Sequence, residues 1–187
     1  MSARTLPTRA DAVRNRERVV AAAAAVFAER GVEAGVPEVA ARAGVGKATV
    51  YRSFPTKEHL IAAVVIEKIA DFELRTRARL DDPDAWGALV AVMVEGAERH
   101  CADRAITAGL SAVIELPELA AARASLWQAV GMLMDRAKEQ GTMRRDARPA
   151  DLRVLWAGAA RMLAADAVDD PAEWRRYAAL VVDALRA

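Results

Sequence analysis

The segment from Val36 to Phe54 constrains the fold of this chain more than any other. Four of its apolar residues recur at the i, i+3, i+4, i+7 spacing of one helix face: Val36, Val39, Ala40 and Ala43. Gly44 follows them, and a glycine there adopts the left-handed conformation that ends a helix without a steric clash. A second short helix then begins at Lys47, with Val50 on its buried side. This spacing predicts a helix-turn-helix.

The second of these helices has a polar surface whose chemistry suits a DNA groove. Its residues away from the buried side are Lys47, Ala48, Thr49, Tyr51 and Arg52. They offer a cation, a methyl group, two hydroxyls and a guanidinium, which are the groups that contact phosphates and base edges in a major groove. A second interpretation, an ordinary corner between two helices of an all-helical domain, fits the same short spacing.

The flanking segments favour the DNA-binding interpretation. An amphipathic helix ended by Gly31 precedes the segment, and Thr56 follows it as the N-cap of a further helix that Lys57 and Glu58 open. Here the chain resembles the DNA-binding domain of the TetR family of transcriptional regulators. The residues that carry the resemblance are Ala23, Phe27, Gly31, Val39, Ala40, Ala43, Gly44, Val45, Thr49, Tyr51, Phe54, Lys57, Glu58 and Leu60.

The resemblance implies a role for each exposed residue of this region. Thr49 and Lys47 are the candidates for base-edge or groove contacts, and Ala48 and Arg52 lie on the same surface. Three further residues are the phosphate candidates: Tyr51, Lys57 and Arg16. At Lys57 the positive end of a helix would add to the attraction, although a plain solvated lysine is the alternative.

The chain departs from the family pattern at Gly35. The family usually has a pair of threonines at the start of the second helix, where this chain has a loop one residue shorter that ends in Gly35 and Val36. Glycine is a weaker helix cap than threonine and has no hydroxyl, so the phosphate contact that the family makes with that side chain does not carry over to this position.

Composition predicts an all-α fold with about nine helices. The chain is 54% hydrophobic but only 5% aromatic, and no alternating strand pattern bounded by turns occurs in it. No apolar run reaches the roughly 18 residues of a membrane span, and no signal peptide is recognisable. A single cysteine, Cys101, excludes an internal disulfide and fits the reducing cytoplasm, and no cofactor or metal set is expected.

Charge divides the chain into two parts. Residues 1–60 carry ten Lys and Arg against six Asp and Glu, whereas residues 61–187 carry seventeen against twenty. We therefore predict an amino-terminal arm and helix-turn-helix domain over 1–60, and a helical effector-binding and dimerisation domain over 61–187. Residues 1–12 are expected to be a disordered tail or a DNA-contacting arm. The helices expected after the long fourth one begin near Ala85, Arg104, Leu119, Pro149 and Pro171.

The second domain contains candidates for a ligand pocket. Broad or adaptable side chains that could line an apolar cavity are Met93, His100, Trp127, Met134 and Trp156. An ordinary hydrophobic core explains the same helical spacing. His100 and Cys101 do not make a catalytic pair, because adjacent residues on a helix point about 100° apart.

The last two helices predict a homodimer. They mix small residues with large apolar ones, and the candidate interface residues are Leu155, Ala159, Met162, Trp174, Tyr177, Val181 and Leu185. The closing segment from Gly141 onward also resembles the SbtR-like branch of the family.

Together these features predict a repressor that binds a pseudo-palindromic double-stranded DNA operator as a homodimer and is released by a small apolar ligand. The ligand response follows from the family resemblance. The alternative is an all-α module whose helix-turn-helix binds protein, and an enzyme is not expected because no nucleophile, base and orienting group come together.

Overall fold

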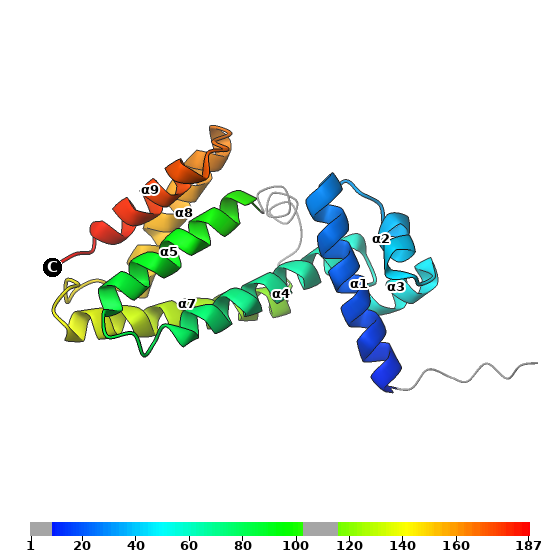
Figure 1. Ribbon diagram of the computed structural model, residues 1–187, viewed down its shortest axis with the longest axis horizontal. Coiled ribbons are helices and arrows are strands. Elements are labelled where there is room, and N and C mark those ends of the chain that lie inside the picture. The colour runs from blue at the N-terminus through cyan, green and yellow to red at the C-terminus, as the bar shows by residue number, and fades with distance from the viewer. Residues whose placement is uncertain (1–8, 103–115) are drawn as a thin grey trace, which may run out of the picture. The chain divides into compact units, whose positions relative to one another are not determined.

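The computed structural model describes residues 9–102 and 116–187, and within these ranges the chain is all-helical, as predicted (Figure 1). Its helices are α1 (Arg9–Arg30), α2 (Val36–Ala43), α3 (Lys47–Ser53), α4 (Lys57–Ala78), α5 (Ala85–Ala102), α7 (Pro117–Glu139), α8 (Pro149–Ala165) and α9 (Pro171–Asp183). A further helix is expected between α5 and α7, near Arg104, and it lies outside the described residues. The first eight residues of the expected arm also lie outside them. Residues 9–12 are not a tail as expected, since they form the first turn of α1.

The helices belong to two compact units. One unit, which we call the head, comprises residues 9–66 and contains α1, α2, α3 and the first half of α4. The other, the body, comprises residues 67–102 and 117–187 and contains the second half of α4 with α5, α7, α8 and α9. The division therefore falls inside α4, between Ile66 and Glu67, and the same helix contributes to both units.

In the head, α2 packs against α1 with the face that its spacing predicts. Val36, Val39, Ala40 and Ala43 are all buried. Gly44 has φ +66°, and the N–H groups of Gly44 and Val45 donate to the carbonyls of Ala41 and Ala40, at 3.2 and 3.0 Å. This pair of hydrogen bonds closes the end of α2 and turns the chain toward α3. Val50 of α3 and Phe54 after it complete the buried side.

Gly44 and Gly46 offer a matched pair of substitutions in this turn. Gly44→Ala is expected to lower the stability of the head by about 1–2 kcal/mol, because alanine is strained in the left-handed region. A Cβ at Gly44 would also meet Nη2 of Arg18 at 3.3 Å. Gly46 is the N-cap of α3, with φ −73° and open space around it, so Gly46→Ala should cost less than about 1 kcal/mol, through the weaker capping by alanine alone. Thermal unfolding followed by circular dichroism measures both, and equal shifts would contradict the conformational argument.

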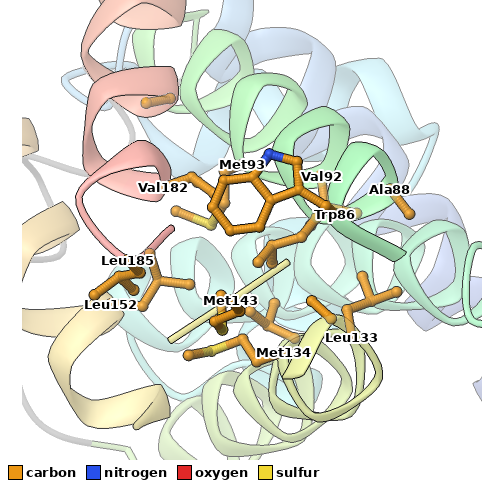
Figure 2. Close-up of a cluster of buried hydrophobic side chains, with 14 of the residues drawn as sticks. Trp86, Ala88, Val92, Met93, Leu133, Met134, Met143, Leu152, Val182 and Leu185 are labelled. Carbon is orange, nitrogen blue, oxygen red and sulfur yellow. The ribbon is translucent and has the colours of Figure 1, made fainter. Parts of the chain in front are cut away.

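In the body, four helices form a closed ring. α5 packs on α9 and α7, and α8 packs on the same two helices. Their inward side chains form one core, and Figure 2 shows part of it, with Trp86, Met93 and Met143 among the labelled side chains. Helix caps fix the ends: the carboxylate of Asp84 accepts from the N–H of Gly87 at 2.9 Å, and that of Asp170 accepts from Ala172 at 2.8 Å. The helix starts predicted near Ala85 and Pro171 are confirmed.

The body half of α4 lies against this ring through side chains. The Phe72 ring packs against the core and approaches α5 where Gly96 leaves room, since a Cβ at Gly96 would lie 3.2 Å from the ring. Thr76 is buried and donates its hydroxyl to the carbonyl of Phe72 at 2.9 Å, so it leaves no unsatisfied polar group.

Candidate functional sites

The outer surface of α3 carries the polar residues that the sequence analysis selected. Lys47, Ala48, Tyr51 and Arg52 are exposed, and Thr49 is half-buried. Tyr51 is 48% exposed although it is aromatic, because Val50 and Phe54 supply the buried contacts of this segment. An exposed phenol ring with two neighbouring cations is a surface suited to a polyanion.

Two residues of this surface bind one another. A guanidinium N–H of Arg52 donates to Oγ1 of Thr49 at 3.0 Å. The bond holds Arg52 over Thr49 and leaves the hydroxyl proton of Thr49 able to donate to a further acceptor. The guanidinium keeps its other N–H groups, so the pair presents donors in a fixed arrangement. This bond was not predicted, although the i, i+3 spacing of the two residues indicates it.

Glu38 compensates for the glycine at the start of α2. Its Oε1 accepts from the backbone N–H of Gly35, the N-cap residue, at 3.1 Å, which is one half of a capping box. The N–H of Glu38, which a threonine side chain at the cap could accept from, donates to the carbonyl of Gly35 at 3.0 Å. Arg30 of α1 pairs with the other oxygen of the same carboxylate. These two donors hold the pKa of Glu38 below its ordinary value of 4.5. The cap is therefore built from Glu38, three residues beyond the position where the family has threonine.

A second ion pair secures the other end of α2. Arg42 in the last turn of α2 pairs with Glu29 of α1 at 2.7 Å. With the Arg30–Glu38 pair, α2 is joined to α1 at both of its ends. Both pairs are exposed, so each contributes little to stability alone, and their main effect is to fix the register of α2 on α1.

Arg16 and Arg18 of α1 contact the ends of the two helices of the turn motif. Nη1 of Arg16 donates to the carbonyl of Ser53 at 3.2 Å, and its guanidinium carbon lies 4.4 Å from the centre of the Phe54 ring. Nη2 of Arg18 donates to the carbonyl of Ala43 at 2.6 Å. Arg16, predicted as a phosphate contact, thus already has partners inside the head.

Lys57 lies at the first position of α4 and is half-buried. Thr56 caps the helix as predicted: its Oγ1 accepts from the N–H of His59 at 3.5 Å and lies 2.9 Å from Nδ1 of the same histidine. A hydrogen bond with Thr56 also lowers the pKa of Glu58, so a carboxylate neighbours Lys57. Lys57 is nevertheless the first residue of α4, so its charge adds to the positive end of the helix, which favours an anion there.

The predicted pocket residues lie in or beside one core of the body. Met93 and Met134 are buried in this core, part of which Figure 2 shows. Trp174 belongs to the same core, and Trp156 packs against it. The His100 ring centre is 5.2 Å from that of Trp174 and 6.2 Å from that of Trp156. Trp127 is partly buried and packs against the same core. The sequence analysis had assigned Trp174 to the dimer surface.

The last two helices present an exposed apolar surface, which we call the α8–α9 face. Its most exposed members are Val154, Leu155, Met162, Tyr177 and Leu180. Ala159 and Val181 are half-buried. Val154 and Leu180, 67% and 50% exposed, were not predicted, although they neighbour predicted residues on the same helices.

Two predicted interface residues are corrected by their positions. Trp174 and Leu185 are buried within the body, at 0% and 5% exposure, and cannot form part of an outer surface. Trp174 donates its indole N–H to the carbonyl of Val168 at 2.9 Å, which ties α9 to the preceding loop. Trp174 shares one face of α9 with Ala178 and Val182, and Leu185 follows the end of the helix; all four belong to the core of the body.

An ion-pair network joins the body half of α4 to α5. Asp71 pairs with Arg99 at 2.9 Å and with Arg75 at 3.2 Å. Glu95 pairs with Arg79 at 3.3 Å, Arg99 at 3.4 Å and Arg75 at 3.7 Å. The arginines, Arg99 first, lower the pKa of Asp71.

On another side of α4, polar groups face α7. Oε1 of Glu73 accepts from Nε of Arg77 at 2.7 Å and from the hydroxyl of Ser125 at 2.8 Å. These two donors lower the pKa of Glu73. α4 is thus joined to the body by polar contacts to both α5 and α7.

Metal and membrane sites receive no support from the described residues. Within residues 9–102 and 116–187, no group of three or more His, Cys, Asp and Glu side chains could hold a metal ion. None of the helices in the described part of the chain is long and apolar enough to cross a bilayer.

Comparison with family models gives two matches. Residues 19–64 match the model described as bacterial regulatory proteins, tetR family. Residues 82–187, more than half of the chain, match the model described as transcriptional regulator SbtR-like, C-terminal domain. The first match covers the helix-turn-helix, and the second covers α5, α7, α8 and α9.

Individual proteins agree with these models. The uncharacterized HTH-type transcriptional regulator TtgW of Pseudomonas putida is 33% identical over 89 residues, which are 47% of this chain and 66% of that protein. The solved TetR transcriptional regulator SCO0520 of Streptomyces coelicolor is 30% identical, with a TM-score of 0.64, over 91% of this chain and 98% of its own. Bacillus subtilis FadR, solved with stearoyl-CoA, is 20% identical and shares the fold, with a TM-score of 0.68 over 90% and 98% of the two chains.

Proposed function

Because this chain belongs to the TetR family of bacterial transcriptional regulators, we propose that it is a repressor that binds its operator as a homodimer and is released by a small apolar ligand. The observation that carries the DNA-binding part is the outer surface of α3. Lys47, Ala48, Thr49, Tyr51 and Arg52 lie there together, and α3 is held on the head by its opposite side. The helix would enter the major groove with this surface toward the base edges.

Within that surface the residues have distinct proposed roles. Lys47 and Thr49 would contact base edges, and the Thr49–Arg52 hydrogen bond would present both side chains to the groove. Tyr51 would donate its hydroxyl to a phosphate. Lys57 would bind a second phosphate, since its ammonium group lies at the positive end of α4.

The α8–α9 face is proposed to form the dimer. An exposed surface with Leu155, Met162, Tyr177 and Leu180 is costly in water, and a two-fold axis would bury the same surface in each subunit. Two heads would then contact successive major grooves, at half-sites about 34–36 Å apart. A pseudo-palindromic operator follows from that symmetry.

Ligand release would act through the body. Met93 and Met134 are adaptable core residues that can make room for an apolar molecule, and the FadR of Bacillus subtilis, which shares the fold, was solved with an acyl-CoA. α4 contributes to both head and body, and its contacts to α5 and α7 are polar. Such contacts would allow α4 to shift when a ligand binds. Coupling requires that the ligand and the operator favour different arrangements.

Binding to the chain's own upstream DNA tests the DNA-binding part. Wild-type protein should prefer that DNA over a scrambled duplex, with an affinity that falls steeply as salt rises. Lys57→Ala is expected to weaken binding about fivefold to tenfold and to reduce the salt slope by about one phosphate contact. Tyr51→Ala should weaken binding by about tenfold. Fluorescence anisotropy at several salt concentrations measures all three.

Arg145→Ala is the matched control, since it removes one exposed positive charge from the body. It should leave operator affinity within about twofold. Binding that ignores sequence and does not change in the Tyr51 and Lys57 variants would refute the proposed function and favour a protein partner for the helix-turn-helix.

A ligand screen can use the tryptophans. All four, Trp86, Trp127, Trp156 and Trp174, lie in the body, so a change of their fluorescence reports binding there. A true effector should also weaken operator binding by about 5-fold to 150-fold. By thermodynamic linkage, operator DNA must weaken the binding of the effector to the protein by the same factor. A compound that changes the fluorescence and leaves operator affinity unchanged is not an effector.

A further inference from the structure

We propose that Arg16 is a positioning residue that fixes the orientation of α3 from within the head, and that its main partners are the end of α3 and the Phe54 ring instead of a DNA phosphate. The inference rests on the proposed DNA-binding function for its consequence in operator affinity. The contacts of Arg16 lie within the head and do not depend on DNA. The role of Arg16 and the proposed DNA-binding function can therefore fail separately.

The first step is the chemistry of the end of α3. The last carbonyls of a helix have no partner within the helix, and together they carry a partial negative charge. Nη1 of Arg16 donates to the carbonyl of Ser53, the last residue of α3, at 3.2 Å. A cationic donor is therefore placed where α3 requires one.

The second step is the Phe54 ring beneath the guanidinium. Phe54 is 2% exposed, and its N–H donates to the carbonyl of Val50 at 2.8 Å, so the ring is rigidly joined to α3. The guanidinium carbon of Arg16 lies 4.4 Å from the ring centre, which is a favourable cation–π distance. Two different contacts thus hold one side chain of α1 against one end of α3.

The third step is the dependence of α3 on such contacts. α3 has seven residues, too few for a helix that is stable by itself in water. Val50 is its one buried side chain, so the direction of the helix axis depends on what fixes its two ends. At the amino-terminal end the Gly44 turn does this, and at the carboxyl-terminal end Arg16 and Phe54 do.

Arg18 makes an equivalent contact with the carboxyl end of α2. Its Nη2 donates to the carbonyl of Ala43, the last residue of α2, at 2.6 Å. Two arginines on α1 therefore each bind the carboxyl end of one helix of the motif. Arg14, on the same helix, instead pairs with Asp11 within α1. It provides an exposed arginine that lacks the contact to α3.

Hydrogen exchange without DNA and operator binding together test the proposal, with Arg16→Ala and the control Arg14→Ala. We expect Arg16→Ala to speed amide exchange across residues 47–54 by about threefold to tenfold, with α2 unchanged, and Arg14→Ala to have no effect on either segment. In operator binding, Arg16→Ala should weaken specific affinity by about threefold to tenfold. Its affinity for a random duplex should stay within about twofold, with an unchanged salt slope.

A phosphate contact gives the opposite pattern. Exchange of α3 would be unchanged, affinities for operator and random duplex would fall alike, and the salt slope would drop by about one contact. That result would overturn the proposal, and so would faster exchange spread equally over α1, α2 and α3, which would indicate general destabilisation. If wild-type protein shows no operator preference, the proposed function fails, and the exchange data still decide the role of Arg16.

Discussion

A chain with Met162→Glu is expected to be monomeric and to lose at least about 100-fold in operator affinity. Met162 is 59% exposed in the body and belongs to the α8–α9 face, with Leu155 and Leu180. Burying an unpaired carboxylate between two apolar surfaces costs several kcal/mol, twice over in a symmetric dimer. Losing the second head removes the gain from simultaneous binding at two half-sites, which is commonly about 100-fold to 10,000-fold.

Leu74→Glu is the matched control, because Leu74 is also an exposed apolar residue of the body, at 70%, and lies on α4 away from the α8–α9 face. It should remain dimeric. Sedimentation gives the mass of both variants, circular dichroism checks that both are folded, and anisotropy gives operator affinity. A dimeric Met162→Glu protein with wild-type affinity would show that the subunits associate through a different surface.

Local spacing was enough to predict the helix-turn-helix. Gly44 takes the left-handed conformation because the chain must turn there, and four buried residues of α2 follow directly from the 3.6-residue period. The aspartate caps at Asp84 and Asp170 were predictable for the same reason, since a cap acts on residues two or three positions away. Glu38 could also have been found, because a Glu at the third helical position is a local capping signal.

Contacts between distant segments were not predictable. Arg16 and Ser53 are 37 positions apart, and Arg18 and Ala43 are 25 apart, so no periodic pattern links them. The sequence analysis could place Arg16 near the start of the first helix, and a phosphate was then its natural partner. The structure gives it a carbonyl and an aromatic ring in the head.

The helical period also does not show which of two apolar faces of a helix is buried within its own subunit. α9 has one face with Trp174 and Val182, buried in the body, and another with Tyr177 and Leu180, which is exposed. Both faces look alike in a sequence of apolar residues at helical spacing. The predicted interface therefore mixed the two, and only the packing of α9 against α5 and α8 separates them.

The inner face of α9 carries the largest expected effect on stability: Trp174→Ala should lower the free energy of unfolding of the body by about 3–5 kcal/mol. The indole is 0% exposed, its ring centre lies 5.2 Å from that of His100 and 6.3 Å from that of Trp156, and its N–H binds the carbonyl of Val168. Alanine would leave a cavity between α5, α8 and α9. Urea unfolding followed by circular dichroism measures the loss.

Trp174→Phe separates the two contributions of the indole. Phenylalanine fills most of the volume but cannot donate to Val168, so it should cost about 1–2 kcal/mol, clearly less than the alanine effect. Because Tyr177 and Leu180 lie on the same helix, the alanine variant should also dimerise more weakly, whereas the phenylalanine variant should dimerise normally. A cost of less than about 1 kcal/mol for Trp174→Ala would contradict this prediction, because it would show that the packing of α9 does not depend on the indole.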